Sequence, residues 1–124
     1  MRTSLATPRR YVENARSLLR EKACEEEGYY QDTKYVRLAG HAAYSGVLLA
    51  LNRILGVKQK GRKSVEWYKE ELGKIDRRAL TTFVAAYDTL HLSMSYDGNP
   101  DAKVALAGLE QADQLIEWVA LRLA

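Results

Sequence analysis

The sequence is poor in the residues that form disulfide bonds and metal sites. Its 124 residues include one cysteine, two histidines and two prolines. The single cysteine, Cys24, excludes an internal disulfide. Neither histidine, His41 or His91, belongs to a Glu-x-x-His motif of the kind that binds metals in ferritin-like helical bundles. We therefore expect no metal and no cofactor, and a fold that does not depend on oxidation.

Long hydrophobic runs are absent as well. The longest strongly apolar run is GVLLAL at 46–51, which is far too short to span a bilayer. The first ten residues, MRTSLATPRR, contain no apolar region of the kind that a secretory signal requires. These absences predict a cytoplasmic protein without a membrane partner.

The residues that are present are typical of a globular domain. Hydrophobic residues make up 47% of the chain and charged residues 28%, and the length fits a single domain over residues 1–124. Apolar residues recur at helical spacing in several segments. Residues that cap or open helices precede these segments: Thr7-Pro8, Asp32 or Thr33, Ser64, Asp76 and Asn99-Pro100. Gly28 and Gly56 are the expected stops of the first two helices.

No segment alternates polar and β-branched residues, so we expect no strands. The helices are joined by short connections, which favour antiparallel neighbours. The helix that begins after Ser64 is shorter than the others. The predicted fold is therefore all-α, an up-and-down four-helix bundle with one additional short helix.

The segment KYVRLAGHAAYSGVLLALNRILG at 34–56 carries the main candidate site. Its small residues, including Gly40 and Gly46, predict that neighbouring helices approach closely, because glycine otherwise costs about 1 kcal/mol in a helix. Arg37, His41 and Tyr44 share one helical face and form a candidate ligand-binding site for phosphate or another anion. The alternative is that Arg37 pairs with an acid of the first helix and His41 is a half-buried structural residue.

A second candidate lies in the basic connector VKQKGRK at 57–63. Residues 1–78 contain 17 basic and 10 acidic side chains, whereas residues 79–124 contain 2 basic and 6 acidic ones. A basic loop can contact a polyanion such as nucleic acid, and it can equally be a solvated connection. The candidate contacts are Lys58, Lys60, Arg62 and Lys63.

Two stretches carry a resemblance to a known family. GYYQDTKYVRLAGHAAYSGVLLALNRILG (28–56) resembles a glycine-tyrosine turn followed by a helix with an Ala-Tyr-small-small core. In LHLSMSYDGNPDAKVALAGLEQADQLIEWVALRL (90–123), Tyr96 follows the fourth helix and Pro100 opens a long final one. Over residues 8–122 this order resembles the HEPN family, the higher eukaryotes and prokaryotes nucleotide-binding domain.

The resemblance implies a helical bundle that often dimerises, and many family members are ribonucleases. Those carry an arginine, four to six residues and then a histidine. Upstream of His91 the nearest arginine is Arg78, which is too far away, and only three residues separate Arg37 from His41. The nuclease motif is therefore absent, and the chain looks like the members that act as binding or scaffold modules beside nucleotidyltransferases.

We therefore expect a non-catalytic binding or scaffold protein that forms a homodimer. Surplus apolar surface at Trp67, Trp118 and Leu121 supports the dimer, because a symmetric contact buries such a patch on both copies. Two alternatives remain open. One is a HEPN-type ribonuclease that uses His41 or His91 as general acid and base. The other is a nucleotide-binding or anion-binding module around Arg37, His41 and Tyr44.

Overall fold

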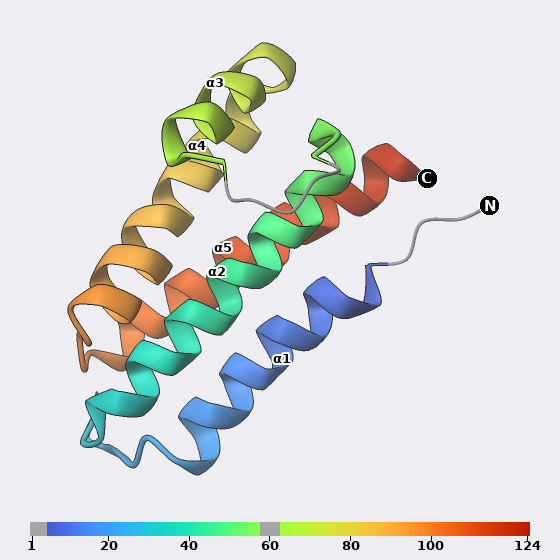
Figure 1. Ribbon diagram of the computed structural model, residues 1–124. Helices are drawn as coiled ribbons and strands as arrows, with labels where there is room; N and C mark the ends of the chain where they lie inside the picture. The colour runs from blue at the N-terminus through green and yellow to red at the C-terminus, as the bar shows by residue number, and fades with distance from the viewer. Residues whose placement is uncertain (1–4, 58–62) are drawn as a thin grey trace.

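The computed structural model describes residues 5–57 and 63–124, and it is predominantly helical (Figure 1). The helices are α1 (Ala6–Glu21), α2 (Thr33–Leu55), α3 (Val65–Ile75), α4 (Arg77–Ala86), η1 (Tyr87–Tyr96), which is a π-helix, and α5 (Ala102–Leu123). Two short strands, β1 (Glu25–Glu26) and β2 (Tyr29–Tyr30), lie between α1 and α2. The prediction of a helical protein is confirmed, whereas the prediction that strands are absent is wrong.

The long helical segments run in alternating directions (Figure 1). Helix α2 packs against α1, η1 and α5, while α4 continues into η1 and packs against α5. Helix α3 contacts α4 at one end of the molecule. The largest fully buried side chains come from every helix: Val12, Val36, Val47, Leu51, Leu72, Phe83, Leu90, Met94, Leu115, Ile116 and Val119. None of the helices in the described part of the chain is long and apolar enough to cross a membrane.

The glycines of α2 mark its closest contacts. A Cβ atom at Gly40 would lie 2.6 Å from the backbone oxygen of Leu90 in η1. A Cβ atom at Gly46 would lie 2.7 Å from the backbone oxygen of Pro8 in α1. Real Cβ atoms do not approach backbone this closely, so only glycine fits at either position. The prediction that small residues admit neighbouring backbones is confirmed.

Three of the predicted helix caps are confirmed. The side chain of Asp32 accepts a hydrogen bond from the backbone N–H of Lys34, and Ser64 accepts one from Trp67. Asp76 accepts two, from the backbone N–H groups of Arg78 and Ala79. Each of these side chains satisfies helix donors that have no partner within the helix. Gly56 ends α2 in the left-handed conformation at φ 73°, as expected.

Two helix starts differ from the prediction. Helix α1 begins at Ala6 without a side-chain cap, so Pro8 is its third residue, where the missing N–H still has no helical acceptor. Helix α5 begins at Ala102, and its cap is Asp101 rather than Asn99. The chain is still extended at Pro100, because the oxygen of Pro100 accepts a hydrogen bond from Tyr30 N–H at 2.8 Å.

The first helix ends at Glu21, seven residues before the predicted stop at Gly28. The three glutamates at 25–27 are unfavourable near the negative end of a helix dipole, which accounts for the early end. Glu27 and Gly28 instead form a tight hairpin turn, with φ values of 52° and 87°. The hairpin is bound to the start of α5, because Ala102 N–H donates to the oxygen of Gly28 at 2.9 Å.

The sequence did not predict the change from α-helix to π-helix at Tyr87. At the end of η1 the N–H of Asp97 donates to the oxygen of Leu92, five residues earlier, at 2.9 Å. Gly98, at φ 64°, then turns the chain towards α5. Segments of this type are rare and often lie at functional sites, which directs attention to the surface where η1 meets α2.

The tryptophans are less exposed than the sequence suggested. Trp118 is half-buried, and its Nε1–H donates to Oδ2 of Asp76 at 2.9 Å. Trp67 is also half-buried and packs edge-on against Tyr68, with 5.1 Å between ring centroids. Leu121 is 68% exposed, as expected. The surplus apolar surface therefore does not come from the tryptophans.

Candidate functional site

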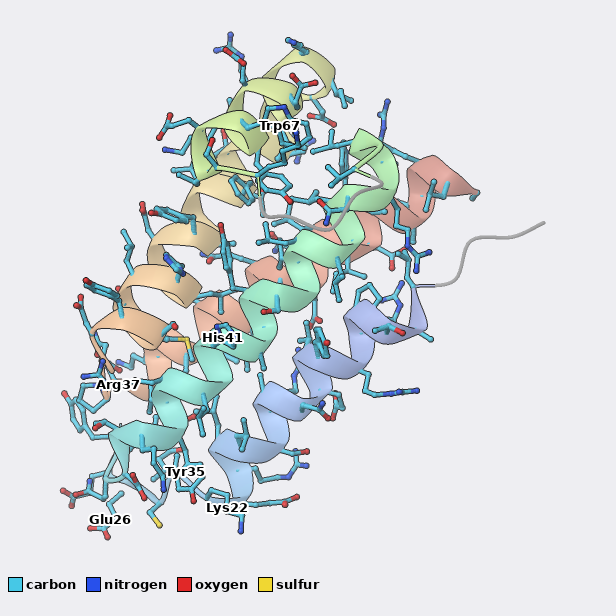
Figure 2. All side chains as sticks on the ribbon, viewed as in Figure 1. Lys22, Glu26, Tyr35, Arg37, His41 and Trp67 are labelled. Atoms are coloured by element: carbon cyan, nitrogen blue, oxygen red, sulfur yellow. The ribbon has the colours of Figure 1, made fainter. Side chains whose placement is uncertain are left out.

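The predicted ligand-binding residues all lie on α2, within three turns of one another. Figure 2 shows Arg37 and His41 on successive turns, with Arg37 nearer the hairpin end. Helix α2 meets η1 here, because Gly40 lets the backbone of Leu90 approach. We call this contact the α2–η1 seam, and it comprises Arg37, Gly40 and Tyr44 of α2 with Tyr87, Leu90, His91, Met94 and Tyr96 of η1.

Arg37 closes the end of η1. Its Nη1 donates to the backbone oxygen of Tyr96, and its Nη2 donates to that of Asp97 at 3.3 Å. The guanidinium also lies over Gly98, where a Cβ atom would be 2.9 Å from Arg37 Nε. The last carbonyls of a helix have no internal donors and carry partial negative charge, so a cation is favoured there. Arg37 therefore caps η1, and its partner is not an acid of α1.

Tyr44 is buried at the centre of the seam. Its ring centroid lies 5.1 Å from that of His91, 6.0 Å from that of Tyr87 and 6.4 Å from that of Phe83. His91 in turn stacks on Tyr87 at 5.2 Å, with 25° between the ring planes. Half-buried His91 is therefore packed against two tyrosine rings.

The ring contacts continue from the seam to α3. Tyr68 packs against Phe83 at 5.8 Å between centroids, and Trp67 packs against Tyr68. The ammonium of Lys69 lies 5.8 Å from the centroid of Tyr87, within range of a cation–π attraction. The aromatic residues thus join α2, α3, α4 and η1 in one continuous contact.

The structure brings together only part of the predicted site. His41 is exposed on α2, and none of the ring contacts described above includes it. Tyr44 is joined by His91 and Tyr87, which the sequence did not place beside it. The helical spacing of Tyr87 and His91 showed that they share a face, but no local signal identified α2 as the facing element. Whether Arg37, His41 and Tyr44 bind a ligand stays a prediction.

The basic connector is largely beyond the described residues, which exclude Lys58, Lys60 and Arg62. Lys63 is described and exposed, and its ammonium lies 5.3 Å from the centroid of the Trp67 ring. Within residues 5–57 and 63–124, no group of three or more histidine, cysteine, aspartate or glutamate side chains is placed to hold a metal ion.

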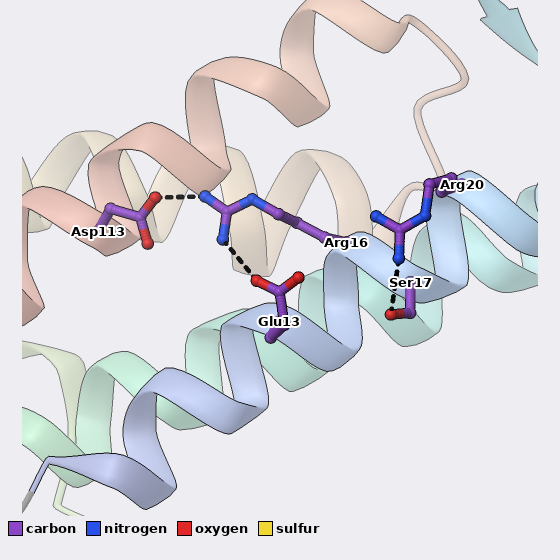
Figure 3. Close-up of polar contacts among 5 residues, drawn as sticks. All are labelled: Glu13, Arg16, Ser17, Arg20 and Asp113. Carbon is purple, nitrogen blue, oxygen red and sulfur yellow. Dashed lines mark hydrogen bonds and ion pairs between the residues drawn. The ribbon is translucent and has the colours of Figure 1, made fainter.

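Other charged groups join helices to one another. Arg16 of α1 donates to Glu13 Oε2 at 3.4 Å and to Asp113 of α5, as Figure 3 shows. Asp76 binds α5 through Trp118, and this hydrogen bond, followed by the one from Ala79 N–H, holds the pKa of Asp76 below its usual value. The side chains of Arg16 and Asp76 therefore hold helices together.

One stripe of α2 is different, because it carries no charge, its two leucines are exposed and its two small residues are half-buried. Leu38, Ala42, Ser45 and Leu49 follow one another at spacings of four, three and four, and we call them the α2 ridge. Leu38 is 46% exposed and Leu49 is 36% exposed. A hollow of about 300 Å³ lies beside the ridge and is lined by Tyr11, Ser45, Leu48, Leu49 and Asn52. The ridge is therefore a candidate interaction site.

Comparison with solved structures found a protein of unknown function from Dyadobacter fermentans. The two chains are 48% identical, with a TM-score of 0.90 over 97% of this chain and 95% of the other. No curated protein matches the sequence. The family model described as Domain of unknown function (DUF5618) matches residues 3–121. The chain therefore belongs to the DUF5618 family.

Proposed function

We propose that this protein is a non-catalytic, cytoplasmic binding module that works as a homodimer, and that its helices form an up-and-down four-helix bundle with α3 as the additional short helix. The structural roles of its polar side chains support the absence of catalysis. Arg37 caps η1, Asp76 caps α4, and Arg16 joins α1 to α5. A HEPN-like ancestry and a partner such as a nucleotidyltransferase belong to this proposal.

The α2 ridge is the observation that carries the dimer. Exposed leucines on a helix that otherwise contributes heavily to the core are surface that water solvates poorly. Complete burial of a fully exposed leucine contributes about 1.5–3 kcal/mol. Because Leu38 is 46% and Leu49 36% exposed, each would contribute somewhat less than half of that, and four at a symmetric contact offset part of the entropic cost of association. A second copy provides the same surface without a further gene product.

Light scattering coupled to size-exclusion chromatography tests the dimer at micromolar concentration. We expect a particle of twice 14.0 kDa. A particle of 14.0 kDa that persists at hundreds of micromolar would contradict the proposal. The same sample, incubated with a nucleotide panel in a thermal-shift assay, should show no stabilisation. A ligand at a hundred times its dissociation constant would add about 2.7 kcal/mol and would be detected.

One observation favours a second candidate, a ribonuclease or nucleotide-binding module. His91 stacks on Tyr87 and faces Tyr44 within a π-helix, and it is half-buried rather than sealed in the core. Purified wild type and the His91→Gln variant would be incubated with single-stranded RNA. Cleavage by the wild type that the variant lacks would establish this candidate and overturn the first. We expect no cleavage by either protein.

A further inference from the structure

We propose that the two-fold axis of the homodimer crosses the α2 ridge between Ala42 and Ser45. This inference rests on the proposed function, which supplies the dimer, and it adds the surface and the pairing of residues. Two copies of α2 would lie antiparallel across the axis. Leu38 of one copy would then contact Leu49 of the partner subunit, and Ala42 would contact Ser45 of the partner subunit.

The order of residue sizes along the ridge carries the proposal. The ridge reads large, small, small, large, with spacings of four, three and four, and this order is unchanged when the chain is read backwards. A two-fold axis perpendicular to α2 makes the facing helix run in the opposite direction, so the ridge of one copy faces the ridge of the other read backwards. Because the ridge has the same order of large and small residues in both directions, the small residues of the two copies face one another and so do the leucines.

The position of the ridge on the helix is consistent with such a contact. Four residues at these spacings fall within one stripe, because each residue turns the helix by about 100°. Gly46 faces α1 and Gly40 faces η1, and the stripe lies outside both of these contacts, with exposed leucines at its ends and half-buried small residues at its centre. The small central residues allow two helix axes to approach to about 8 Å, and the leucines on either side then fill the space beside them.

The composition of the ridge and its surroundings favours an apolar protein surface, such as a second copy of this chain, over a polyanion as the occupant. Tyr11 of α1 borders the ridge at Ser45 and Leu49. Arg37 precedes Leu38, but its guanidinium is bound to the carbonyls of Tyr96 and Asp97. The next cations along α2 are Lys34 and Arg53, which lie beyond the two leucines. An apolar centre with charges at its rim is the usual composition of a protein interface. It does not suit a polyanion, which would need cations at the centre.

Cysteine cross-linking tests the pairing directly in a Cys24→Ser background. Leu38→Cys and Leu49→Cys would be prepared as separate proteins, mixed to allow subunit exchange, and treated with a short bifunctional thiol reagent. Each variant alone should give no covalent dimer, because equivalent positions in the two copies lie about 16 Å apart along the axis, eleven residues at 1.5 Å each. The mixture should give a covalent dimer in high yield.

Leu106→Cys mixed with Leu49→Cys is the control for non-specific reaction. Leu106 is 60% exposed on α5, so its thiol is as accessible but is outside the ridge. Cross-linking of this control at the same yield would overturn the proposal. So would a dimer in which either single variant cross-links and the mixture gains nothing.

Charge substitution gives an independent readout by sedimentation. Leu38→Asp should raise the dimer dissociation constant tenfold or more, roughly the cost of an unpaired charge at a closed interface. The matched Leu106→Asp variant should dimerise like the wild type. Circular dichroism on both variants checks that they fold, which is expected because both leucines are exposed.

The outcomes separate this inference from the proposed function. A wild-type monomer would overturn both. A wild-type dimer that Leu38→Asp leaves intact, and whose mixed cysteine variants do not cross-link, would overturn the axis at the α2 ridge and leave the homodimer standing. Dissociation by Leu106→Asp instead would place the interface on α5.

Discussion

At the scale of single residues, identical amino acids have opposite roles in this protein. Gly40 and Gly73 both lie inside helices, where glycine is intrinsically unfavourable. Gly40 is enclosed by the backbone of η1, whereas a Cβ atom at Gly73 would meet only Leu80 Cδ2 at an ordinary 3.5 Å. The residue type alone therefore does not reveal the cost of substitution.

Replacing each glycine by alanine should consequently shift stability in opposite directions. Gly40→Ala should lower the free energy of unfolding by about 1–3 kcal/mol, because its methyl group collides with backbone that cannot move independently. Gly73→Ala should raise it by about 0.4–1 kcal/mol, since the unfolded chain loses conformational freedom. Urea denaturation followed by circular dichroism measures both values. A stable Gly40→Ala variant would show that η1 is not packed as closely as described.

Asp76 should make stability depend on acid pH. Its pKa is lowered first by the hydrogen bond from Trp118 and then by that from Ala79 N–H. A group with a lower pKa in the folded state stabilises the fold above its unfolded pKa, near 4, and this contribution is lost as pH falls through the lower folded value. The wild type should therefore lose stability below about pH 4.

The Asp76→Asn variant isolates that effect, because asparagine still caps a helix but carries no titrating charge. We expect its urea midpoint to fall less steeply with acidification than that of the wild type. Asp88→Asn, which removes an exposed carboxylate of η1, is the matched control. Parallel acid profiles for wild type and Asp76→Asn would contradict the assignment. Trp118 fluorescence reports the local change.

At the scale of helices and strands, η1 depends on a side chain from another element. Arg37→Met removes the donors to Tyr96 and Asp97 but keeps a long apolar stem. The amides of Asp97 and Gly98 should then exchange with deuterium about 5–30-fold faster, equivalent to the loss of about 1–2 kcal/mol. Hydrogen exchange followed by mass spectrometry measures this change.

Arg10→Met, at an exposed position of α1, is the control for the loss of a positive charge. It should leave exchange in η1 unchanged. Equal protection of Asp97 and Gly98 in wild type and Arg37→Met would show that the guanidinium does not hold the end of η1, and that Arg37 is free for the ligand role predicted from the sequence.

The sequence predicted the helix starts that are determined by residues close together in the chain. Asp32, Ser64 and Asp76 cap helices through bonds that span two or three residues, so their positions can be recognised in a single chain. The hairpin and η1 could not be found in this way. The hairpin is bound by Pro100 and Ala102, and η1 is contacted by Gly40 and Arg37. Both depend on partners about fifty to seventy residues away.

The same limit applies to the candidate site. Arg37, His41 and Tyr44 were grouped because a helix brings them to one side, and they do lie on neighbouring turns. The partners of Arg37 and Tyr44 come from η1 and α4, however, so their separate roles emerge only from tertiary structure. His91 is half-buried and stacks on Tyr87, which the sequence places on the same helical face.

At the scale of the whole molecule, the proposed dimer should respond to salt. The two-fold axis that pairs Leu38 with Leu49 of the partner subunit also brings Lys34 towards Arg53 of the partner subunit, at both ends of the ridge. Like charges repel, and salt screens the repulsion. The dimer dissociation constant should therefore fall by about two- to tenfold from low to high salt, the range expected for two exposed pairs.

Reversal of one charge should reverse this trend. Lys34→Glu places opposite charges together, so the variant should dimerise more tightly than the wild type at low salt and lose that advantage as salt is added. Lys103→Glu, at an exposed position of α5, is the control with the same change in net charge. Sedimentation velocity across a salt series distinguishes the three proteins. Identical responses of the two variants would contradict the proposed pairing.

The hairpin has a consequence for biosynthesis. Its backbone bonds join residues 28–30 to residues 100–102, so this end of the molecule cannot close until most of the chain has left the ribosome. Helices α1 and α2 emerge long before that and can pair early, because their contact is local. During translation the side of α2 that is buried in the folded protein, including Val36 and Val47, is therefore exposed. We expect chaperones to bind the nascent chain most strongly at that stage.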